Sequence, residues 1–234
     1  MIYCIGDVHG EAEALREMLG LLPVEPSDLL VLLGDIINRG PASFDCVEQV
    51  LGFDRCRKVF VQGNHEEAML AYLEMGDAST LMSMGGQATL DSYARAGYAA
   101  QPGVPDTIPP AHAQLYAQAL GWTLPFYITP DYIFTHAGWN LSLPLERQSP
   151  DAMRWGGLKG QEASVWAQTI VRGHVPFPKV MFARRKGYVG VDTGCGRGGL
   201  LSAVALPSEQ VWTVRPASFR PDWYTHRRST RHSY

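Results

Sequence analysis

The sequence predicts an α/β fold in which two mixed β-sheets pack face to face and are flanked by helices. Short apolar runs alternate with amphipathic stretches through the first third of the chain, which is typical of parallel strands joined by crossover helices. From Leu124 onward the pattern changes to a series of strands, which favours a second sheet packed on the first. A length of 234 residues suits one domain with a single core.

The alternating segments are, in order, strand, helix, strand, helix, strand and helix, at residues 2–5, 11–22, 29–33, 43–51, 58–61 and 65–75. Further helices are predicted at 86–96 and 111–120. They are separated by a stretch with four prolines, 97–110, that is a candidate lid or recognition surface. Later strands are predicted at residues 126–128, 132–135, 169–172, 188–191, 200–206 and 210–215. Residues 1–215 form the expected domain, and residues 216–234, which lack apolar periodicity, form an irregular tail.

The composition is that of a globular protein and argues against several functions. A net charge of −3 gives no general attraction to nucleic acid or to anionic membranes. No segment is apolar for the roughly 18 residues that a membrane span needs, and no signal peptide is recognisable. The four cysteines lie far apart, which is typical of buried free thiols. We expect a soluble, cytoplasmic protein without membrane or specific nucleic-acid partners; the oligomeric state does not follow from the sequence.

Three glycine-containing motifs follow the first three predicted strands. They are GDVHG at residues 6–10, GDIINRG at 34–40 and GNHE at 63–66. Because the carboxyl ends of parallel strands meet at one edge of a sheet, we expect Asp7, Asp35 and Asn64 to lie close together. His9 is two residues from Asp7, so that both side chains can point at one ion.

Two histidines follow later predicted strands, His136 in THAG and His174 in RGH. Carboxylate and imidazole ligands with one amide oxygen suit Mn²⁺, Fe or Zn²⁺, whereas an all-oxygen set favours Mg²⁺ or Ca²⁺. Two such ions roughly 3.5 to 4 Å apart polarise a phosphoryl group and lower the pKa of a bridging water, which gives a hydroxide nucleophile. The sequence therefore predicts a centre with two divalent ions, Mn²⁺ first, for direct hydrolysis of phosphoesters.

The motifs carry a resemblance that extends over residues 2–215. GDVHG, GDIINRGP, GNHE, THAG, RGH and VDTGC resemble the ordered signature of the PPP-type phosphoprotein phosphatases within the calcineurin-like metallophosphoesterases. The middle stretch GGQATLDSY and the closing VDTGC segment are similar to those of the short bacterial serine/threonine phosphatases. The resemblance implies the calcineurin-like fold and dependence on divalent metals.

The resemblance also implies a role for each motif residue. Arg39 would bind the substrate phosphate through both arms of its guanidinium, and His65 would be the general acid that protonates the leaving alkoxide. The implied metal ligands are Asp7 and His9 on the first ion, Asp35 as the bridge, and Asn64, His136 and His174 on the second ion.

Two positions depart from the protein-phosphatase pattern. The second carboxylate, which orients the acid histidine in those enzymes, is Asn38 here. An amide can accept a hydrogen bond from the His65 ring but carries no charge, so we expect a lower pKa of His65 and a weaker acid step. Arg154 is predicted as a second phosphate ligand, replacing an arginine that bacterial phosphatases place two residues after a tryptophan. Trp139, which ends THAGW, is a candidate wall of the pocket.

The predicted function is hydrolysis of phosphomonoesters, above all phosphoserine and phosphothreonine in proteins. The main alternative is a diadenosine tetraphosphate hydrolase, because those relatives also lack a carboxylate at the position of Asn38 and share a similar DTGC segment. A phosphate-binding pseudoenzyme is less favoured, and the tail arginines only weakly suggest nucleic-acid processing. The sequence leaves open whether Asn38 reflects a slower enzyme, another substrate class or a laboratory substitution.

Overall fold

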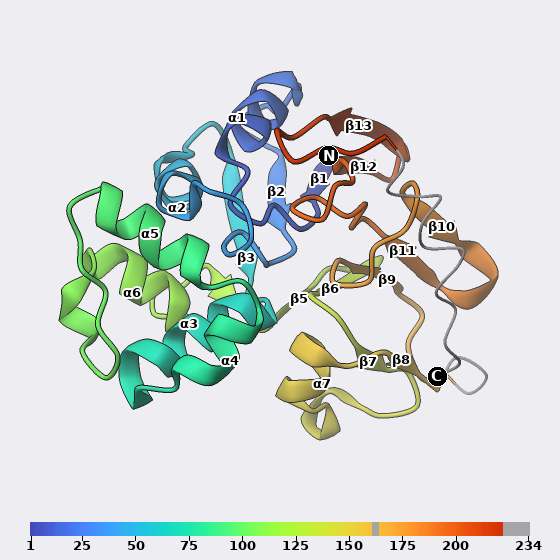
Figure 1. Ribbon diagram of the computed structural model, residues 1–234. Coiled ribbons are helices and arrows are strands. Elements are labelled where there is room, and N and C mark those ends of the chain that lie inside the picture. Colours follow the sequence, from blue (N-terminus) through green and yellow to red (C-terminus); the bar gives the residue numbers. More distant parts are fainter. Residues whose placement is uncertain (161–163, 222–234) are drawn as a thin grey trace.

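A computed structural model describes residues 1–160 and 164–221 (Figure 1). Six strands form the first sheet, in the order β13-β12-β1-β2-β3-β4. Its parallel part consists of β1 (Ile2–Ile5), β2 (Leu29–Leu32), β3 (Arg57–Val61) and β4 (Thr123–Leu124). On the other side of β1 the sheet continues through two antiparallel strands, β12 (Leu201–Leu206) and β13 (Gln210–Val214).

The second sheet contains five strands in the order β10-β11-β9-β6-β5. Its three central strands, β11 (Tyr188–Gly190), β9 (Thr169–Arg172) and β6 (Tyr132–Thr135), are parallel. The antiparallel edges are β10 (Met181–Ala183) and β5 (Phe126–Ile128). A separate parallel pair is formed by β7 (Trp139–Asn140) and β8 (Leu158–Lys159).

Helices cover the outer faces of the sheets (Figure 1). They are α1 (Ala12–Leu21), α2 (Ser43–Gly52), α3 (Asn64–Met75), α4 (Ala78–Ser83), α5 (Gln87–Arg95), α6 (Pro110–Tyr116) and α7 (Pro150–Trp155). Single 3₁₀ turns occur at Pro105–Thr107, Leu145–Arg147 and Arg184–Lys186. Helices α3 to α6 gather on one side, and α7 lies with β7 and β8 beside the second sheet.

The alternation of side chains along the strands explains why the two sheets pack together. In β1, Tyr3 and Ile5 contact the core under α1 and α2, whereas Cys4 between them faces the second sheet. Phe134 of β6 and Val171 of β9 lie in that same inter-sheet core. Both faces of the first sheet are therefore buried, which accounts for strands that are apolar at nearly every position.

Much of the sequence prediction is confirmed. The predicted two-sheet α/β fold is present, each predicted helix and strand is found within a few residues of its expected place, and all four cysteines are buried and free. No helix in the described part of the chain is long and apolar enough to cross a bilayer. Residues 216–221 contain no helix or strand, and the rest of the predicted tail, 222–234, lies outside the described residues.

One assignment of strands to sheets is wrong. The strand pattern after Leu124 predicts a second sheet for all later strands, whereas β12 and β13 extend the first sheet. Strand β2 pairs with only one edge of β1, so the other edge offers unpaired backbone groups, and β12 satisfies them with the register Ile2↔Leu206 to Ile5↔Ala203. An apolar strand pattern does not encode which edge the strand will join.

Candidate metal centre

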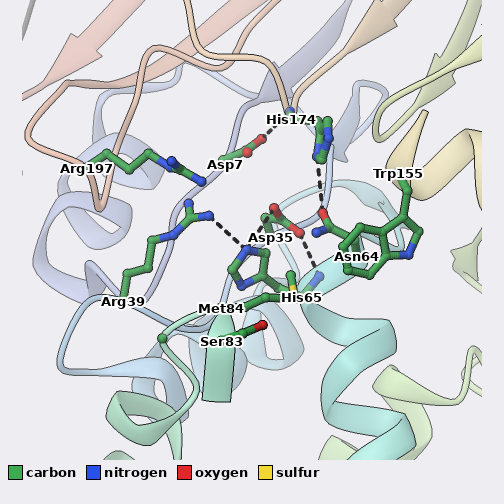
Figure 2. Close-up of a pocket in the computed structure, with 11 residues that line it drawn as sticks. Asp7, Asp35, Arg39, Asn64, His65, Ser83, Met84, Trp155, His174 and Arg197 are labelled. Atoms are coloured by element: carbon green, nitrogen blue, oxygen red, sulfur yellow. Dashed lines mark hydrogen bonds and ion pairs between the residues drawn. The ribbon is translucent and has the colours of Figure 1, made fainter. Parts of the chain in front are cut away.

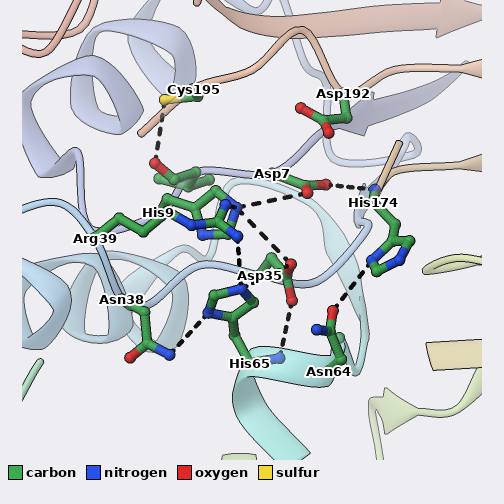
Figure 3. A network of polar contacts seen from close by, with 12 residues as sticks. Asp7, His9, Asp35, Asn38, Arg39, Asn64, His65, His174, Asp192 and Cys195 are labelled. Carbon is green, nitrogen blue, oxygen red and sulfur yellow. Dashed lines mark hydrogen bonds and ion pairs between the residues drawn. The ribbon is translucent and has the colours of Figure 1, made fainter. Parts of the chain in front are cut away.

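The predicted ligands converge where the carboxyl ends of both sheets meet. Asp7 and Asp35 lie in the loops after β1 and β2, and Asn64 ends the loop after β3 as the first residue of α3. His136 follows β6, and His174 lies two residues after β9. Of these, only His174 is more than slightly exposed. Two sheets therefore contribute to one buried cluster of carboxylate, imidazole and amide groups (Figure 3).

Asp35 is at the centre of this cluster. Its Oδ2 atom lies 3.3 Å from Nε2 of His136 and 3.8 Å from Nε2 of His9. Nε2 of His65 is 3.7 Å from the same oxygen. Two sets of donor atoms are close enough to hold an ion, His9 with Asp35 and His65, and Asp35 with His136 and His174. Asp35 belongs to both sets, as expected of a shared ligand.

Asn64 and Asp7 are the remaining ligand candidates, and they lie on opposite sides of Asp35 (Figure 3). Oδ1 of Asn64 lies 2.9 Å from Nε2 of His136 and 3.2 Å from Nδ1 of His174. On the other side, Oδ2 of Asp7 is 3.7 Å from Nε2 of His9. The backbone N–H of His174 donates to Oδ1 of Asp7 at 3.1 Å, which ties the loops of the two sheets together.

Strained backbone accompanies this convergence. Seven non-glycine residues of the described chain have positive φ, and five of them are His9, Asp35, Asn38, Arg39 and His174. Each such residue costs roughly 1–2 kcal/mol relative to the right-handed conformation. Strain concentrated at one cluster is characteristic of a functional site, where the fold holds side chains in an arrangement that local preferences disfavour.

A cavity of about 460 Å³ opens over the cluster (Figure 2). Its lining residues are Asp7, Asp35, Arg39, Asn64, His65, Ser83, Met84, Gly85, Trp155, His174 and Arg197. Arginines and metal-type ligands therefore face the same space, and none of the lining residues comes from the predicted lid, 97–110.

Comparison with known proteins decides the family. A family model described as calcineurin-like phosphoesterase matches residues 1–196. The chain belongs to the calcineurin-like phosphoesterase family. Phosphoesterases of this family use divalent metals, in agreement with the donor groups gathered around Asp35.

Relatives of this phosphoesterase carry two kinds of name. Serine/threonine-protein phosphatase 2 of Escherichia coli (strain K12) is 37% identical over 86 residues, which cover 36% of this chain and 38% of that protein. The asymmetrical bis(5'-nucleosyl)-tetraphosphatase PrpE of Geobacillus thermodenitrificans is 28% identical over 245 residues, covering 93% and 94% of the two chains. The chain thus spans well under half of the first relative and nearly all of the second.

A solved structure supports the fold over the whole length. The crystal structure of a protein proposed to be a diadenosine tetraphosphatase superposes with a TM-score of 0.67, covering 92% of this chain and 93% of that one. At 23% identity this likeness concerns the fold alone.

Hydrogen bonds to backbone carbonyls orient the imidazole rings of His9 and His136 in this phosphoesterase. Nδ1 of His9 lies 3.1 Å from the carbonyl oxygen of Ile37, and Nδ1 of His136 lies 2.6 Å from that of Leu33. Because a carbonyl only accepts, each Nδ1 carries a proton, and the Nε2 atom that faces Asp35 is the one that would bind a metal. Both rings are thereby held in the orientation that a metal ligand requires. Although burial opposes it, the charge of Asp35 raises the pKa of His136 to about 10, so Nε2 of His136 also carries a proton that a metal would displace.

Charge in the cluster favours bound cations. Burial, together with Asp192 and Asp35, raises the pKa of Asp7 well above its usual range. Burial and the charge of Asp35 raise the pKa of Asp192 to about 6, although the backbone N–H of Gly194 donates to its carboxylate. Three buried carboxylates this close repel one another, and divalent ions relieve that repulsion. The residues present therefore fit the metals that the family implies. Asp192 was missed as a site residue, although it lies within the DTGC motif.

The structure changes the expected contact between Asn38 and His65. Oδ1 of Asn38 accepts from the hydroxyl of Thr89 at 2.6 Å, so its amide nitrogen faces Nδ1 of the ring at 2.8 Å. The amide therefore donates to the ring, which corrects the expectation from the sequence that it would accept. Arg39 faces the other ring nitrogen at 3.0 Å. Because a neutral imidazole accepts at one nitrogen only, the amide of Asn38 at Nδ1 leaves the ring proton on Nε2. Burial lowers the pKa of His65 to about 3, which favours this neutral form.

The predicted second phosphate ligand lies elsewhere. Arg154 pairs with Glu67 at 2.5 Å and with Asp151 at 3.6 Å, and it is absent from the cavity lining. Arg197, in the loop before β12, is the second arginine that faces the cavity (Figure 2). The only sequence signal for it is its place inside VDTGCGRGG.

The tryptophan that lines the cavity is Trp155, not the predicted Trp139. Trp139 is 1% exposed and packs against Phe126 and Trp166 in the core outside the second sheet. Trp155 is 44% exposed and lines the cavity. Trp139 lies only three residues after His136, but the chain bends at His136 and Ala137 before β7 begins, so closeness in sequence did not place its ring in the cavity.

Glu66 organises the loops that carry the cluster. One of its carboxylate oxygens accepts from the backbone N–H groups of Asp35, at 2.8 Å, and Gly63, at 3.0 Å. The other oxygen accepts from the N–H of Ile36 at 2.9 Å. The side chain is fully buried, so no water replaces these contacts. Glu66 thus fixes the loop after β2 against the start of α3.

We expect Glu66→Ala to lower the free energy of unfolding of the metal-free protein by roughly 3 kcal/mol, because each buried N–H left without an acceptor costs about 1–3 kcal/mol. Glu66→Gln should lose less, since its carbonyl oxygen still accepts from Asp35 and Gly63. Urea unfolding of the three proteins measures the difference. Equal stability of the Ala and Gln variants would contradict the role assigned to these hydrogen bonds.

Proposed function

We propose that the cluster binds two divalent metal ions, with Mn²⁺ as the first candidate and Fe or Zn²⁺ as alternatives. Asp35 would be the shared ligand. The other proposed ligands are Asp7 and His9 on one ion and Asn64, His136 and His174 on the other. The support is the convergence of their donor atoms, with neighbouring atoms 2.9 to 3.8 Å apart, and the crowding of buried negative charge. When bound, the ions would activate water and neutralise charge on the phosphoryl oxygens.

The chain's own residues would position the substrate phosphates. The guanidinium of Arg39 reaches the cavity beside His9 and His65, where its planar fork suits two phosphoryl oxygens. Arg197 is exposed in the same cavity and would hold a neighbouring phosphate. His65 would hold a proton at the Nε2 atom that faces the cavity.

The proposed substrate class is a dinucleoside polyphosphate, such as diadenosine tetraphosphate, and the observation that carries it is the Asn38–His65 contact. Expulsion of a serine alkoxide needs a proton in the transition state, whereas a phosphate chain leaves as a weakly basic anion. The neutral amide of Asn38 donates to the ring and offers no negative charge to support an imidazolium. A site built in this way suits cleavage of a phosphoanhydride.

The comparisons favour the same substrate class. The tetraphosphatase of Geobacillus thermodenitrificans aligns over 93% of this chain, whereas the Escherichia coli phosphatase aligns over 36%. Hydrolysis of phosphoserine and phosphothreonine in proteins, the function first predicted from the sequence, is the second candidate. It is supported by the higher identity, 37%, of that shorter alignment.

A substrate panel at fixed Mn²⁺ tests the proposal. Diadenosine tetraphosphate should be hydrolysed with a kcat/KM at least tenfold above that for a phosphoserine peptide, and chelation should remove both activities. A preference for the phosphopeptide would support the second candidate instead. Binding of either compound without turnover would identify a pseudoenzyme.

We expect Asn38→Asp to raise kcat on the phosphoserine peptide by at least roughly tenfold, because a carboxylate at this position would support a protonated His65. Hydrolysis of diadenosine tetraphosphate should change much less, since its leaving group needs no proton. Steady-state kinetics on both substrates measures the contrast. Equal changes on the two substrates would refute the link between Asn38 and the leaving group.

A further inference from the structure

The cavity has an aromatic wall that the proposed metal chemistry does not use. Trp155 ends α7 and is 44% exposed, yet it lines the cavity together with Asn64 and His174. Figure 2 shows the indole on the side of Asn64, across the cluster from Arg39 and Arg197. A cavity lined by an aromatic ring and a few convergent polar groups is typical of ligand-binding sites.

The ring is held in place from its edge. The indole N–H of Trp155 donates to one carboxylate oxygen of Glu67 at 2.5 Å, and Arg154 pairs with the other oxygen at 2.5 Å. Glu67 belongs to α3, the helix that begins with Asn64. Because the polar edge is already bonded to the helix that carries a proposed metal ligand, a ligand would meet the apolar faces of the ring.

The helix that carries the ring is fixed to the loop of His136. The backbone N–H of Ala137 donates to the carbonyl of Met153 at 2.6 Å, and that of Gly138 donates to Ala152 at 3.0 Å. A Cβ atom on Gly138 would lie 2.4 Å from the Ala152 carbonyl oxygen, so this close approach requires glycine. Trp155 therefore stands at a fixed position relative to the cluster, and ordering it on binding would cost little entropy.

The two sides of the cavity specify the chemistry of the ligand. One side offers the guanidinium groups of Arg39 and Arg197, which suit a chain of phosphates. The other side offers Trp155, and the thioether of Met84 lines the cavity between the two sides (Figure 2). A molecule with a polyanionic part and a flat aromatic part, joined by a short linker, matches both. Nucleoside polyphosphates have this form.

We propose that Trp155 is a base-stacking residue, which binds a purine ring of the nucleotide while the arginines hold its phosphates. This inference rests on the proposed function, since it names the group that would distinguish a nucleotide from a peptide or inorganic phosphate. Stacking of a base on an aromatic side chain is strong enough to determine substrate preference.

Kinetics on two phosphoanhydrides tests the role of the ring. Trp155→Ala should raise KM for diadenosine tetraphosphate roughly five- to hundredfold, the range expected for one stacked base. Inorganic tripolyphosphate has no base, so the factor by which Trp155→Ala lowers kcat/KM on it should be at least fivefold smaller than the factor on diadenosine tetraphosphate. Trp155→Phe keeps a stacking face and should recover most of the loss. Equal losses on both substrates, or no loss on either, would overturn the proposal.

A binding measurement separates this proposal from the proposed function. AMP added to the Mn²⁺-loaded protein should quench the tryptophan fluorescence, and Trp155→Phe should remove that quenching while circular dichroism stays unchanged. Quenching that depends on Trp155 would support the base site even if diadenosine tetraphosphate were not cleaved. Quenching unaffected by Trp155→Phe, or its absence in the wild-type protein, would contradict the base site even if cleavage occurred.

Discussion

Replacing Asp35 with Asn is expected to lower the metal-dependent kcat/KM roughly 10³-fold, the upper range for losing one group that stabilises transition-state charge. Asp35 belongs to both sets of donor atoms, so its loss would weaken both metal sites at once. The amide keeps the size of the carboxylate but removes its charge from the centre of the cluster. Activity on diadenosine tetraphosphate and bound metal per chain, measured on the same sample, should fall together.

An exposed residue provides the matched control for this change. Asp54 follows α2 on the surface and takes no part in the cluster, so Asp54→Asn removes the same charge elsewhere in the chain. It should leave metal content and rate unchanged. An Asp35→Asn protein that still held two ions per chain and kept more than about a tenth of the rate would refute the shared-ligand assignment.

Arg39→Ala is expected to lower kcat/KM roughly 10²- to 10³-fold, because a preorganised donor aimed at the phosphoryl oxygens is lost. Arg39→Lys should recover only part of this loss, since an ammonium group keeps the charge but not the planar pair of donors. Inorganic phosphate provides a second readout, because its inhibition constant should rise in both variants. Separate values of kcat and KM show whether Arg39 acts on the ground state or the transition state.

Arg184 provides the control for this second change. It is exposed and pairs only with Glu209 among the described residues, so Arg184→Ala removes a guanidinium remote from the cavity. The control should behave as the wild-type protein. A loss below about threefold in Arg39→Ala, with unchanged inhibition by phosphate, would exclude Arg39 as a phosphate ligand.

The convergence around Asp35 was predictable because each residue of the cluster follows a strand closely in the sequence. Parallel strands joined by helices must bring their carboxyl ends to one edge, so residues placed directly after β1, β2 and β3 meet. His136 and His174 follow the same rule in the second sheet. Face-to-face packing of the two sheets then brings both groups together.

The walls of the cavity were not predictable in the same way. Arg197 and Trp155 reach it from a loop and from a short helix whose positions depend on tertiary contacts. Arg154 and Trp155 are adjacent, yet Glu67 binds the first through its guanidinium and the second through its indole edge, which leaves only the ring in the cavity. The orientation of Asn38 likewise depends on Thr89, fifty-one positions away in the chain.

Titration of the metal-free chain with Mn²⁺ tests the central claim most directly, if bound metal and hydrolysis of diadenosine tetraphosphate are measured at each step. The proposed centre predicts two bound ions per chain and a rate that rises mainly as the second ion binds, because both are needed to hold the water and the phosphate. Hydrolysis at full rate without added metal, or saturation at one ion per chain, would contradict a dinuclear centre around Asp35.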